Sequence, residues 1–274
     1  MKFAICNETF QDWPFEKACE FAREVGYTGI EIAPFTLAPS ATDVSDSQRR
    51  EIRRQAESLG LQVIGLHWLL AKTEGYYLTT PDEGVRHRTA EYIRQLARLC
   101  RDLGGDIMVL GSPQQRNLLP GVGLTEATGH AVHVIEQVLP TLDELGVTLA
   151  LEPLGPAEGD FWTTAQETVQ TIERIGSRRV QLHLDVKAMS SEPRPVGETI
   201  RQSHQHLVHF HANDPNKRGP GMGDVDFIPI FTALNDVAYQ GWVSVEVFDY
   251  SPGIEYLATE SLRYMRQCAA KIAT

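Results

Sequence analysis

The chain of 274 residues has few cysteines and no long hydrophobic run. Its four cysteines, Cys6, Cys19, Cys100 and Cys268, are scattered and form no CxxC pair. They indicate buried, reduced thiols and argue against a disulfide framework. The longest apolar stretches have the length of a strand, which is too short to span a membrane. Acidic and aromatic residues begin too close to the N-terminus for a signal peptide, so we expect a cytoplasmic protein without a membrane partner.

The chain also lacks an excess of positive charge. Its formal net charge is −11, which opposes a phosphate backbone as a partner rather than attracting it. We therefore expect no nucleic acid partner, although net charge alone leaves room for a local basic patch. Hydrophobic residues make up 42% of the chain, enough to bury a sizeable core and to exclude a disordered protein.

Eight short runs rich in valine, isoleucine and leucine recur along the chain and predict eight β-strands. They cover residues 3–6, 29–33, 62–68, 106–112, 148–154, 180–186, 207–213 and 242–248. Amphipathic segments of helical period separate them. Three of these segments end in a glycine just before a β-branched run, in EVGYTGIEI, SLGLQVIGL and ELGVTLALE. This repeated loop pattern implies parallel strands joined by crossover helices.

Eight such units without a linker or a change in composition predict one α/β domain over residues 1–274. The architecture we expect is a single (β/α)8 TIM barrel, with its active site at the C-terminal ends of the strands. A chain of this length can also hold two ordinary domains. A doubly wound, open parallel sheet is the alternative fold.

Four of the predicted strands end in a side chain that can bind a metal ion. These are Glu152 in TLALEPL, Asp185 in VQLHLDV, His211 in LVHFHAND and Glu246 in WVSVEVFD. A charge at the end of an apolar strand has no structural role unless something outside the strand needs it. Two glutamates, an aspartate and a histidine form a mixed oxygen and nitrogen ligand set for one divalent metal ion. We expect Mn²⁺ first, with Mg²⁺, Co²⁺ and Zn²⁺ as alternatives.

Side-chain alternation along the strands places these candidates on one rim. His209 and His211 fall on one side of their strand, whereas Val208 and Phe210 face the helices. The four candidates are about one βα unit apart, so they belong to the fifth, sixth, seventh and eighth strands. Neighbouring parallel strands lie about 4.8 Å apart, so four inward side chains can share one ion. The alternative is that each is only a capping or salt-bridged polar residue.

The chain resembles the xylose-isomerase-like TIM-barrel superfamily, in particular its group of ketose 3-epimerases, hydroxypyruvate isomerases and inosose dehydratases. The resemblance runs through all eight predicted units. Its most specific segments are LEPLGPAE (151–158), LHLDVKAM (182–189), HFHANDPNKRGPGMGDVDF (209–227) and VSVEVF (243–248). It implies that Glu152, Asp185, His211 and Glu246 bind one divalent metal ion.

The resemblance also implies contacts to the substrate. Glu158 matches a carboxylate of the family that contacts sugar hydroxyls near C1 and C2. The chain departs from the family at two positions: Ala188 replaces a histidine that touches the substrate in many relatives, and Lys217, followed by Arg218, replaces an arginine. A cation is retained at the second position, but an ammonium is not equivalent to a planar guanidinium. At the first, Lys187 is the inward-facing neighbour, so we expect Lys187 and Lys217 to bind the substrate here.

The implied activity is that of a sugar isomerase or epimerase acting on a ketose or a related polyol. The ion would hold two adjacent oxygens and polarise a carbonyl, which acidifies the neighbouring C–H bond. One of the catalytic pair Glu152 and Glu246 removes the proton, giving a metal-stabilised cis-enediolate, and the other returns it. Protonation of the opposite face gives epimerisation, and protonation of the adjacent carbon gives isomerisation. Loss of a β-hydroxyl gives dehydration, as in a lyase acting on a keto-inositol.

Two further residues are candidates for substrate binding. His67, in GLHWLL, faces the barrel mouth, where substrate contact and packing under a lid are equal alternatives. Arg116 lies in the loop after the fourth strand, where it can reach a hydroxyl, a carboxylate or a phosphate, or lie in solvent.

Two other functions fit parts of the pattern. Apurinic endonucleases share this barrel but need a three-metal cluster with additional histidines, and the alanine at position 188 does not supply one. A non-catalytic sugar-binding barrel would need neither of the two flanking glutamates. We therefore expect a small-molecule sugar or polyol as the partner. By analogy with relatives, the chain forms a homodimer or a homotetramer.

Overall fold

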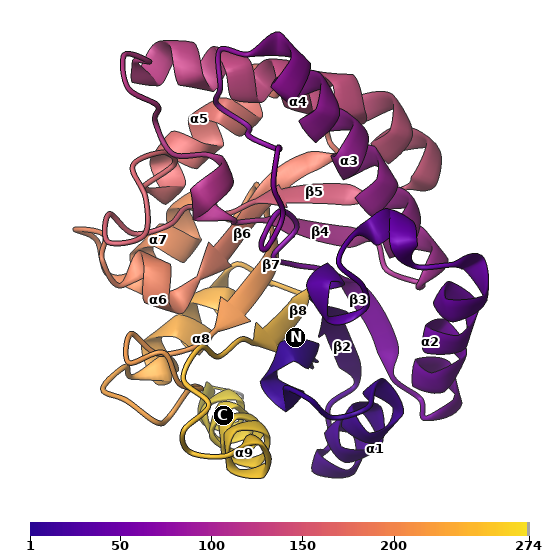
Figure 1. The fold of residues 1–274 in the computed structure, drawn as a ribbon. Helices are drawn as coiled ribbons and strands as arrows, with labels where there is room; N and C mark the ends of the chain where they lie inside the picture. The colour runs from indigo at the N-terminus through magenta and orange to yellow at the C-terminus, as the bar shows by residue number, and fades with distance from the viewer. Residues whose placement is uncertain (273–274) are drawn as a thin grey trace.

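The computed structural model describes residues 1–272, whose eight strands form a closed barrel in sequence order (Figure 1). The strands are β1 (Lys2–Cys6), β2 (Gly29–Ile32), β3 (Gln62–Leu66), β4 (Ile107–Leu110), β5 (Thr148–Leu151), β6 (Val180–Asp185), β7 (Leu207–Ala212) and β8 (Trp242–Val245). All neighbours pair in parallel, and β8 pairs with β1 to close the ring. This confirms the predicted TIM barrel and excludes the open sheet, whose edge strands would stay unpaired.

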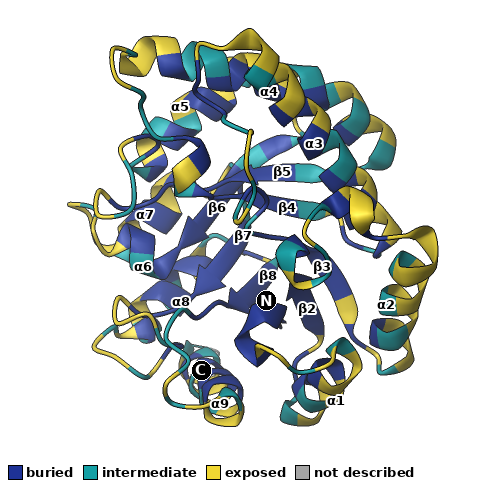
Figure 2. Cartoon of the chain, viewed as in Figure 1, coloured by how far each residue is buried: buried dark blue, intermediate teal, exposed yellow. Residues whose placement is uncertain are grey.

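Helices surround the barrel and cover the outer surface of the strands (Figure 1). They are α1 (Phe15–Val25), α2 (Asp46–Ser58), α3 (Glu83–Asp102), α4 (Leu124–Leu145), α5 (Ala165–Ile175), α6 (Val186–Met189), α7 (Val196–Ser203), α8 (Phe227–Asp236) and α9 (Ile254–Ile272). Short 3₁₀ turns occur at η1 (Asn7–Phe10), η2 (Pro34–Thr36), η3 (Ala41–Asp43) and η4 (Pro113–Gln115). Figure 2 shows the strands buried and the outer faces of the helices exposed. Within residues 1–272, no helix has the length and apolar character needed to cross a membrane.

The helix ends follow capping signals in the sequence. Gly26 and Gly146 have φ of 110° and 70° and end α1 and α4 in a left-handed conformation, which glycine adopts without steric cost. At the start of α2, Ser45 and Gln48 form a capping box. These signals determine where the chain leaves each helix and enters the next strand.

All four strands that carry predicted ligands end earlier than expected. The strands β5, β6, β7 and β8 end at Leu151, Asp185, Ala212 and Val245, whereas the predicted strands continue to residues 154, 186, 213 and 248. At β6 the reason is local: the Asp185 carboxylate caps the short helix α6 and accepts a hydrogen bond from the Ala188 amide at 2.8 Å. Lys187 therefore extends from helix α6 and not from the end of β6, where the sequence analysis placed it.

The interior of the barrel changes from apolar to polar along its axis. The N-terminal end is closed by a small apolar cluster of Ala4, Ile64 and Trp242. Above it lies a layer of polar side chains, each no more than 1% exposed: Glu31, His183, His209 and Ser244. TIM barrels usually fill this layer with branched apolar residues. The polar layer lies directly under the mouth, where the predicted ligands are found.

Candidate metal centre

The four predicted ligands converge at the C-terminal mouth of the barrel. One ligand atom from each of Glu152, Asp185, His211 and Glu246 lies within 4.8 Å of the other three. Each of the four residues is at most 7% exposed. Asp185 is the last residue of β6 and His211 is the second-to-last residue of β7, whereas Glu152 and Glu246 directly follow β5 and β8. We refer to these four residues as the ligand quartet.

Asp185 is held by backbone and side-chain hydrogen bonds on both of its oxygens. Its Oδ1 accepts the Ala188 amide, and its Oδ2 accepts the side-chain amide of Asn213 at 2.5 Å. The side-chain oxygen Oδ1 of Asn213 in turn accepts the backbone amide of Lys187 at 2.9 Å. Asn213 lies two residues after His211, so the segment that supplies His211 also orients Asp185.

Glu246 is held by two different donors. The indole of Trp68 donates a hydrogen bond to its Oε1 at 2.6 Å, and Nδ1 of His211 lies 3.1 Å from its Oε2. Trp68 has a left-handed backbone with φ of 54°, a conformation that L side chains adopt rarely. Its ring stacks on Phe248, with the ring centroids 5.8 Å apart. These contacts fix the direction of the Glu246 carboxylate.

Glu152 occupies space that the β4–η4 loop leaves open. A side chain at Gly111 would overlap the Oε2 atom of Glu152, so glycine at this position makes room for the carboxylate. The backbone carbonyl of Glu152 accepts a hydrogen bond from Nη1 of Arg116 at 2.7 Å. The loop after β4 therefore leaves space for the carboxylate of Glu152 and holds its backbone carbonyl through a hydrogen bond.

The carboxylates of the quartet differ in their electrostatic environment. Burial, together with the charges of Glu246 and Asp185, holds the pKa of Glu152 well above its usual range. Burial and Glu246 also raise the pKa of Asp185 to about 6. For Glu246 burial acts in the same direction, but His211 and the hydrogen bonds from His211 and Trp68 outweigh it and lower the pKa. Three carboxylates in one small volume repel each other, and a cation among them relieves that repulsion.

The chemistry of this donor set fits a divalent metal ion. Three carboxylates and one imidazole supply hard oxygen ligands and one nitrogen ligand, a combination used for Mn²⁺, Mg²⁺, Co²⁺ and Zn²⁺. Burial and the neighbouring carboxylates raise the pKa values of Glu152 and Asp185, and a cation at the place where the ligand atoms meet would offset that repulsion. Neighbouring hydrogen bonds orient the ligands, as is usual around metal sites.

A cavity of about 320 Å³ opens next to the quartet. Glu152, Asp185 and Glu246 form part of its wall, and Trp68 and Phe248 form an aromatic part of it. The volume falls in the range of small-molecule pockets. The quartet thus faces a space suited to a small ligand.

Two of the predicted substrate contacts also line this cavity. Lys187 and Glu158 form an ion pair there, with 2.7 Å between Nζ and Oε1. Burial lowers the pKa of Lys187, but Asp185 and Glu158 raise it more, so the ammonium stays charged. A paired cation and anion therefore stand beside the quartet in the same cavity.

Two other predicted substrate contacts lie behind the cavity wall. His67 is fully buried, and its Nε2 lies 2.7 Å from Oε2 of Glu8. Arg116 is 2% exposed, and its Nη1 donates to the backbone carbonyls of Leu110 and Glu152. Its Nη2 and the Nδ1 of His67 are buried without a hydrogen-bond partner among the described residues. Neither residue lines the cavity, so their expected contacts with a substrate stay predictions.

Lys217 does not form part of the cavity wall either. It is exposed on the loop between β7 and α8, and its backbone has φ of 71°. Its carbonyl accepts the amides of Phe248 and Asp249 at 2.8 and 2.9 Å. The neighbouring cation, Arg218, pairs with Asp249 at 2.8 Å. The backbone of Lys217 and the side chain of Arg218 thus bind the segment after β8, and neither residue lines the cavity.

Comparison with known proteins identifies the family of the chain. A family model described as xylose isomerase-like TIM barrel matches residues 19–268. The chain belongs to the xylose isomerase-like TIM-barrel family. It is 32% identical, over 262 residues, to a D-psicose 3-epimerase of Enterocloster bolteae, covering 90% of this chain and 82% of that protein. An L-ribulose 3-epimerase of Mesorhizobium japonicum is 29% identical over 236 residues, 85% of this chain and 75% of the relative.

Solved structures agree with this assignment at the level of the fold. A crystal structure of a D-psicose 3-epimerase in the presence of D-fructose superposes with a TM-score of 0.87. The alignment covers 98% of this chain and 99% of that chain at 23% sequence identity. This likeness confirms the barrel and its arrangement of helices.

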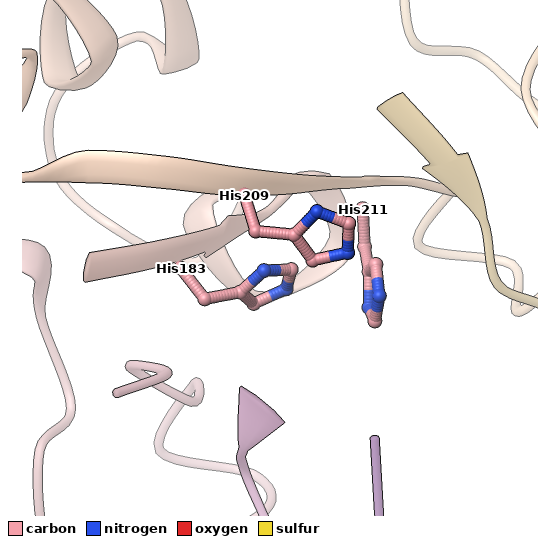
Figure 3. Close-up of side chains that lie close together, drawn as sticks. All are labelled: His183, His209 and His211. Atoms are coloured by element: carbon pink, nitrogen blue, oxygen red, sulfur yellow. The ribbon is translucent and has the colours of Figure 1, made fainter. Parts of the chain in front are cut away.

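This xylose isomerase-like barrel also contains a buried acidic and imidazole cluster around Glu31, the residue of this cluster that the sequence analysis missed. Oε2 of Glu31 lies 2.8 Å from Nε2 of His209 and 3.1 Å from Nε2 of His211. Figure 3 shows the rings of His183, His209 and His211 side by side in the barrel. The available signal was a glutamate in the middle of the apolar run GIEIA, at a position where a strand of this kind is otherwise hydrophobic.

Proposed function

We propose that the protein is a divalent-metal-dependent epimerase of a ketose, with Glu152 and Glu246 as its acid and base. The observation that carries the proposal is the convergence of Glu152, Asp185, His211 and Glu246 within 4.8 Å beside a cavity. The names of the relatives, D-psicose 3-epimerase and L-ribulose 3-epimerase, support a sugar substrate. They also favour epimerisation at the carbon next to the carbonyl over isomerisation or dehydration.

A bound divalent ion supplies Lewis-acid polarisation of the substrate carbonyl, which acidifies the adjacent C–H bond. Glu246 is the carboxylate that His211 and Trp68 keep ionised, so we assign proton removal to Glu246. Glu152 is the other glutamate of the quartet, and we assign to it the proton that is returned. It returns a proton to the opposite face of the planar enediolate, which inverts the carbon. In the reverse reaction the two glutamates exchange roles.

The remaining cavity residues suit the hydroxyl groups of a sugar. A hydroxyl can donate a hydrogen bond to Glu158 and accept one from Lys187, since these two groups lie 2.7 Å apart on one wall. Trp68 and Phe248 exclude water from another part of the cavity. Glu158 and Lys187 therefore orient the substrate, and the aromatic rings limit exchange of the transferred proton with solvent.

The proposal is tested by following proton exchange in D₂O. The protein is stripped with EDTA, reloaded with Mn²⁺ and incubated with a panel of ketoses, keto-inositols and keto acids. NMR should show deuterium at the carbon next to the carbonyl of a ketose, together with the C3 epimer. Deuterium at C1 would instead indicate an isomerase, and loss of water would indicate a dehydratase.

The matched variants are Glu246→Gln and Glu57→Gln. Loss of a general base lowers the rate by about 10²–10⁴-fold, so Glu246→Gln should exchange deuterium at least that much more slowly. Glu57 lies on the outer face of α2 with a side chain 58% exposed, and Glu57→Gln should keep the wild-type rate. Equal rates with and without metal, or full exchange by Glu246→Gln, would contradict the proposal.

A further inference from the structure

Glu31 is a fully buried carboxylate that the proposed reaction does not use. It lies in β2 and is 1% exposed, yet it contacts two side chains of β7 across the barrel. A buried carboxylate is costly unless it is paired. The Oε2 atom of Glu31 is paired, because it lies 2.8 Å from Nε2 of His209 and 3.1 Å from Nε2 of His211. Glu31 is therefore a hydrogen-bonding carboxylate next to a member of the ligand quartet.

The two ring nitrogens of His211 face different partners. Nε2 lies 3.1 Å from Oε2 of Glu31, in the interior of the barrel. Nδ1 lies 3.1 Å from Oε2 of Glu246, in the quartet. A carboxylate oxygen accepts a hydrogen bond from a ring N–H group, so the contact with Glu31 suits a proton on Nε2. The contact of Nδ1 with Glu246 joins two members of the quartet, and a bound ion would take the place of a proton there. Nδ1 is then the nitrogen that would bind the ion.

We propose that Glu31 is a positioning residue that holds His211 in the tautomer and ring orientation required for metal binding through Nδ1. This inference rests on the proposed metal site. Histidine ligands commonly donate their second ring N–H to a carboxylate, which fixes the ring and raises its basicity. Here β2 supplies that carboxylate and β7 supplies the ligand, so the closed barrel brings the two together.

The other neighbours of Nε2 are weaker partners. The Cys6 sulfur lies 3.9 Å from Nε2 of His211 and 3.5 Å from the Ser244 hydroxyl. A thiol is a weak hydrogen-bond partner, and it lies farther from Nε2 than the 3.1 Å that separates Nε2 from Glu31. Among the described residues, Glu31 is thus the carboxylate in hydrogen-bond contact with this nitrogen.

His209 provides an internal control, because it shares the same carboxylate. Its Nε2 lies 2.8 Å from Oε2 of Glu31, and His209 is not a member of the quartet. Loss of either Glu31 or His209 breaks the buried cluster. Only loss of Glu31 removes the acceptor of His211. The two variants therefore separate a positioning role from a purely structural role.

The experiment compares Mn²⁺ binding by metal-stripped wild-type, Glu31→Gln and His209→Gln proteins, using calorimetry. Loss of an outer hydrogen-bond partner typically weakens metal binding by about 10–100-fold. We expect that loss for Glu31→Gln and a near-normal affinity for His209→Gln, with one ion per chain in each protein. The visible absorption of Co²⁺-loaded protein should change in Glu31→Gln only.

A second measurement needs no variant. The wild-type protein is labelled with ¹⁵N-histidine and loaded with diamagnetic Mg²⁺ or Zn²⁺. The nitrogen shifts of His211 should then show a proton on Nε2 and none on Nδ1. This measurement decides the question if Glu31→Gln fails to fold.

Several outcomes would overturn the inference. One is unchanged affinity in Glu31→Gln, and another is an equal loss in His209→Gln. A proton on Nδ1 of His211 in the loaded wild-type protein would also exclude it. Two ions per chain would mean that the buried cluster itself holds a metal. If the wild-type protein binds no divalent ion, the proposed function fails first, and this result is distinct from all the others.

Discussion

At the scale of single residues, Trp68 combines a strained backbone with a contact to a proposed catalytic group. Its φ of 54° is left-handed, and strain of this kind costs about 1–3 kcal/mol and persists where the surroundings enforce it. The indole donates to Glu246 at 2.6 Å and packs between Phe248 and Phe35, with ring centroids 5.8 and 5.6 Å away. We infer that the strained turn serves to aim this donor at Glu246.

Trp68→Phe removes the indole N–H and keeps an aromatic ring. A hydrogen bond to a charged group contributes about 1.5–3 kcal/mol, so kcat for the ketose should fall by about tenfold or more, since 1.36 kcal/mol is tenfold in rate. KM should change little, because the ring still walls the cavity. Steady-state kinetics measure both constants. Trp13→Phe, on a tryptophan that packs against Phe10 and Phe21, is the control; equal kcat in both variants would contradict the role of the indole.

The sequence predicts the quartet better than it predicts the substrate contacts. Asp185 and His211 belong to regular strands, whose alternation determines where a side chain points. Arg116 and Lys217 lie in loops, where the direction depends on individual dihedral angles such as the positive φ of Lys217. Glu31 was missed because a lone glutamate in a strand gives no sign of its partners on β7.

At the scale of the elements, the loop after each strand determines how a strand-end residue is used. The β4–η4 loop begins with Gly111, which lies against the Glu152 carboxylate. The glycine stops that shape the αβ loops, such as Gly26 and Gly146, were readable from the sequence because they follow helical periodicity. The need for glycine at position 111 could not be predicted from the sequence, because it arises from the Glu152 side chain at the end of the neighbouring strand.

Gly111→Ala should displace the carboxylate of Glu152 and leave the fold intact. The added methyl would meet the flexible end of a side chain and not the backbone. We expect weaker Mn²⁺ binding by calorimetry and a far-ultraviolet circular dichroism spectrum like that of the wild type. Gly123→Ala is the matched control, because a methyl there meets no atom within 4 Å. Unchanged metal affinity in Gly111→Ala would show that the carboxylate does not need this space.

At the scale of the whole molecule, ring closure brings distant parts of the chain to one site. Pairing of β8 with β1 places Glu246 near Trp68, which follows β3. The barrel was predictable because eight strand and helix units alternate without interruption. A cytoplasmic location, the absence of a nucleic acid partner and assembly into dimers or tetramers stay predictions from the sequence.

Metal binding should stabilise the whole barrel, because the four ligands come from four different strands. They lie close together in the folded chain and not in the unfolded chain, so only the folded chain binds the ion tightly. At an ion concentration about 100 times Kd, linkage adds about 2.7 kcal/mol. For a domain of this size that raises Tm by about 5 °C. Differential scanning calorimetry with EDTA and with Mn²⁺ measures the shift. A Tm that is the same in both conditions would contradict a site formed by the folded barrel.

The most direct test of the account is the metal stoichiometry of the wild-type protein beside that of Asp185→Asn. Asp185 and His211 are the two members of the quartet to which we assign no proton transfer, so substitution of Asp185 tests metal binding alone. Titration of the metal-stripped protein with Mn²⁺, checked by elemental analysis, should give one ion per chain for the wild type. Asp185→Asn should bind much more weakly or not at all. A wild-type protein that binds no divalent ion, or an Asp185→Asn protein with unchanged affinity, would contradict the assignment of the quartet as a metal site.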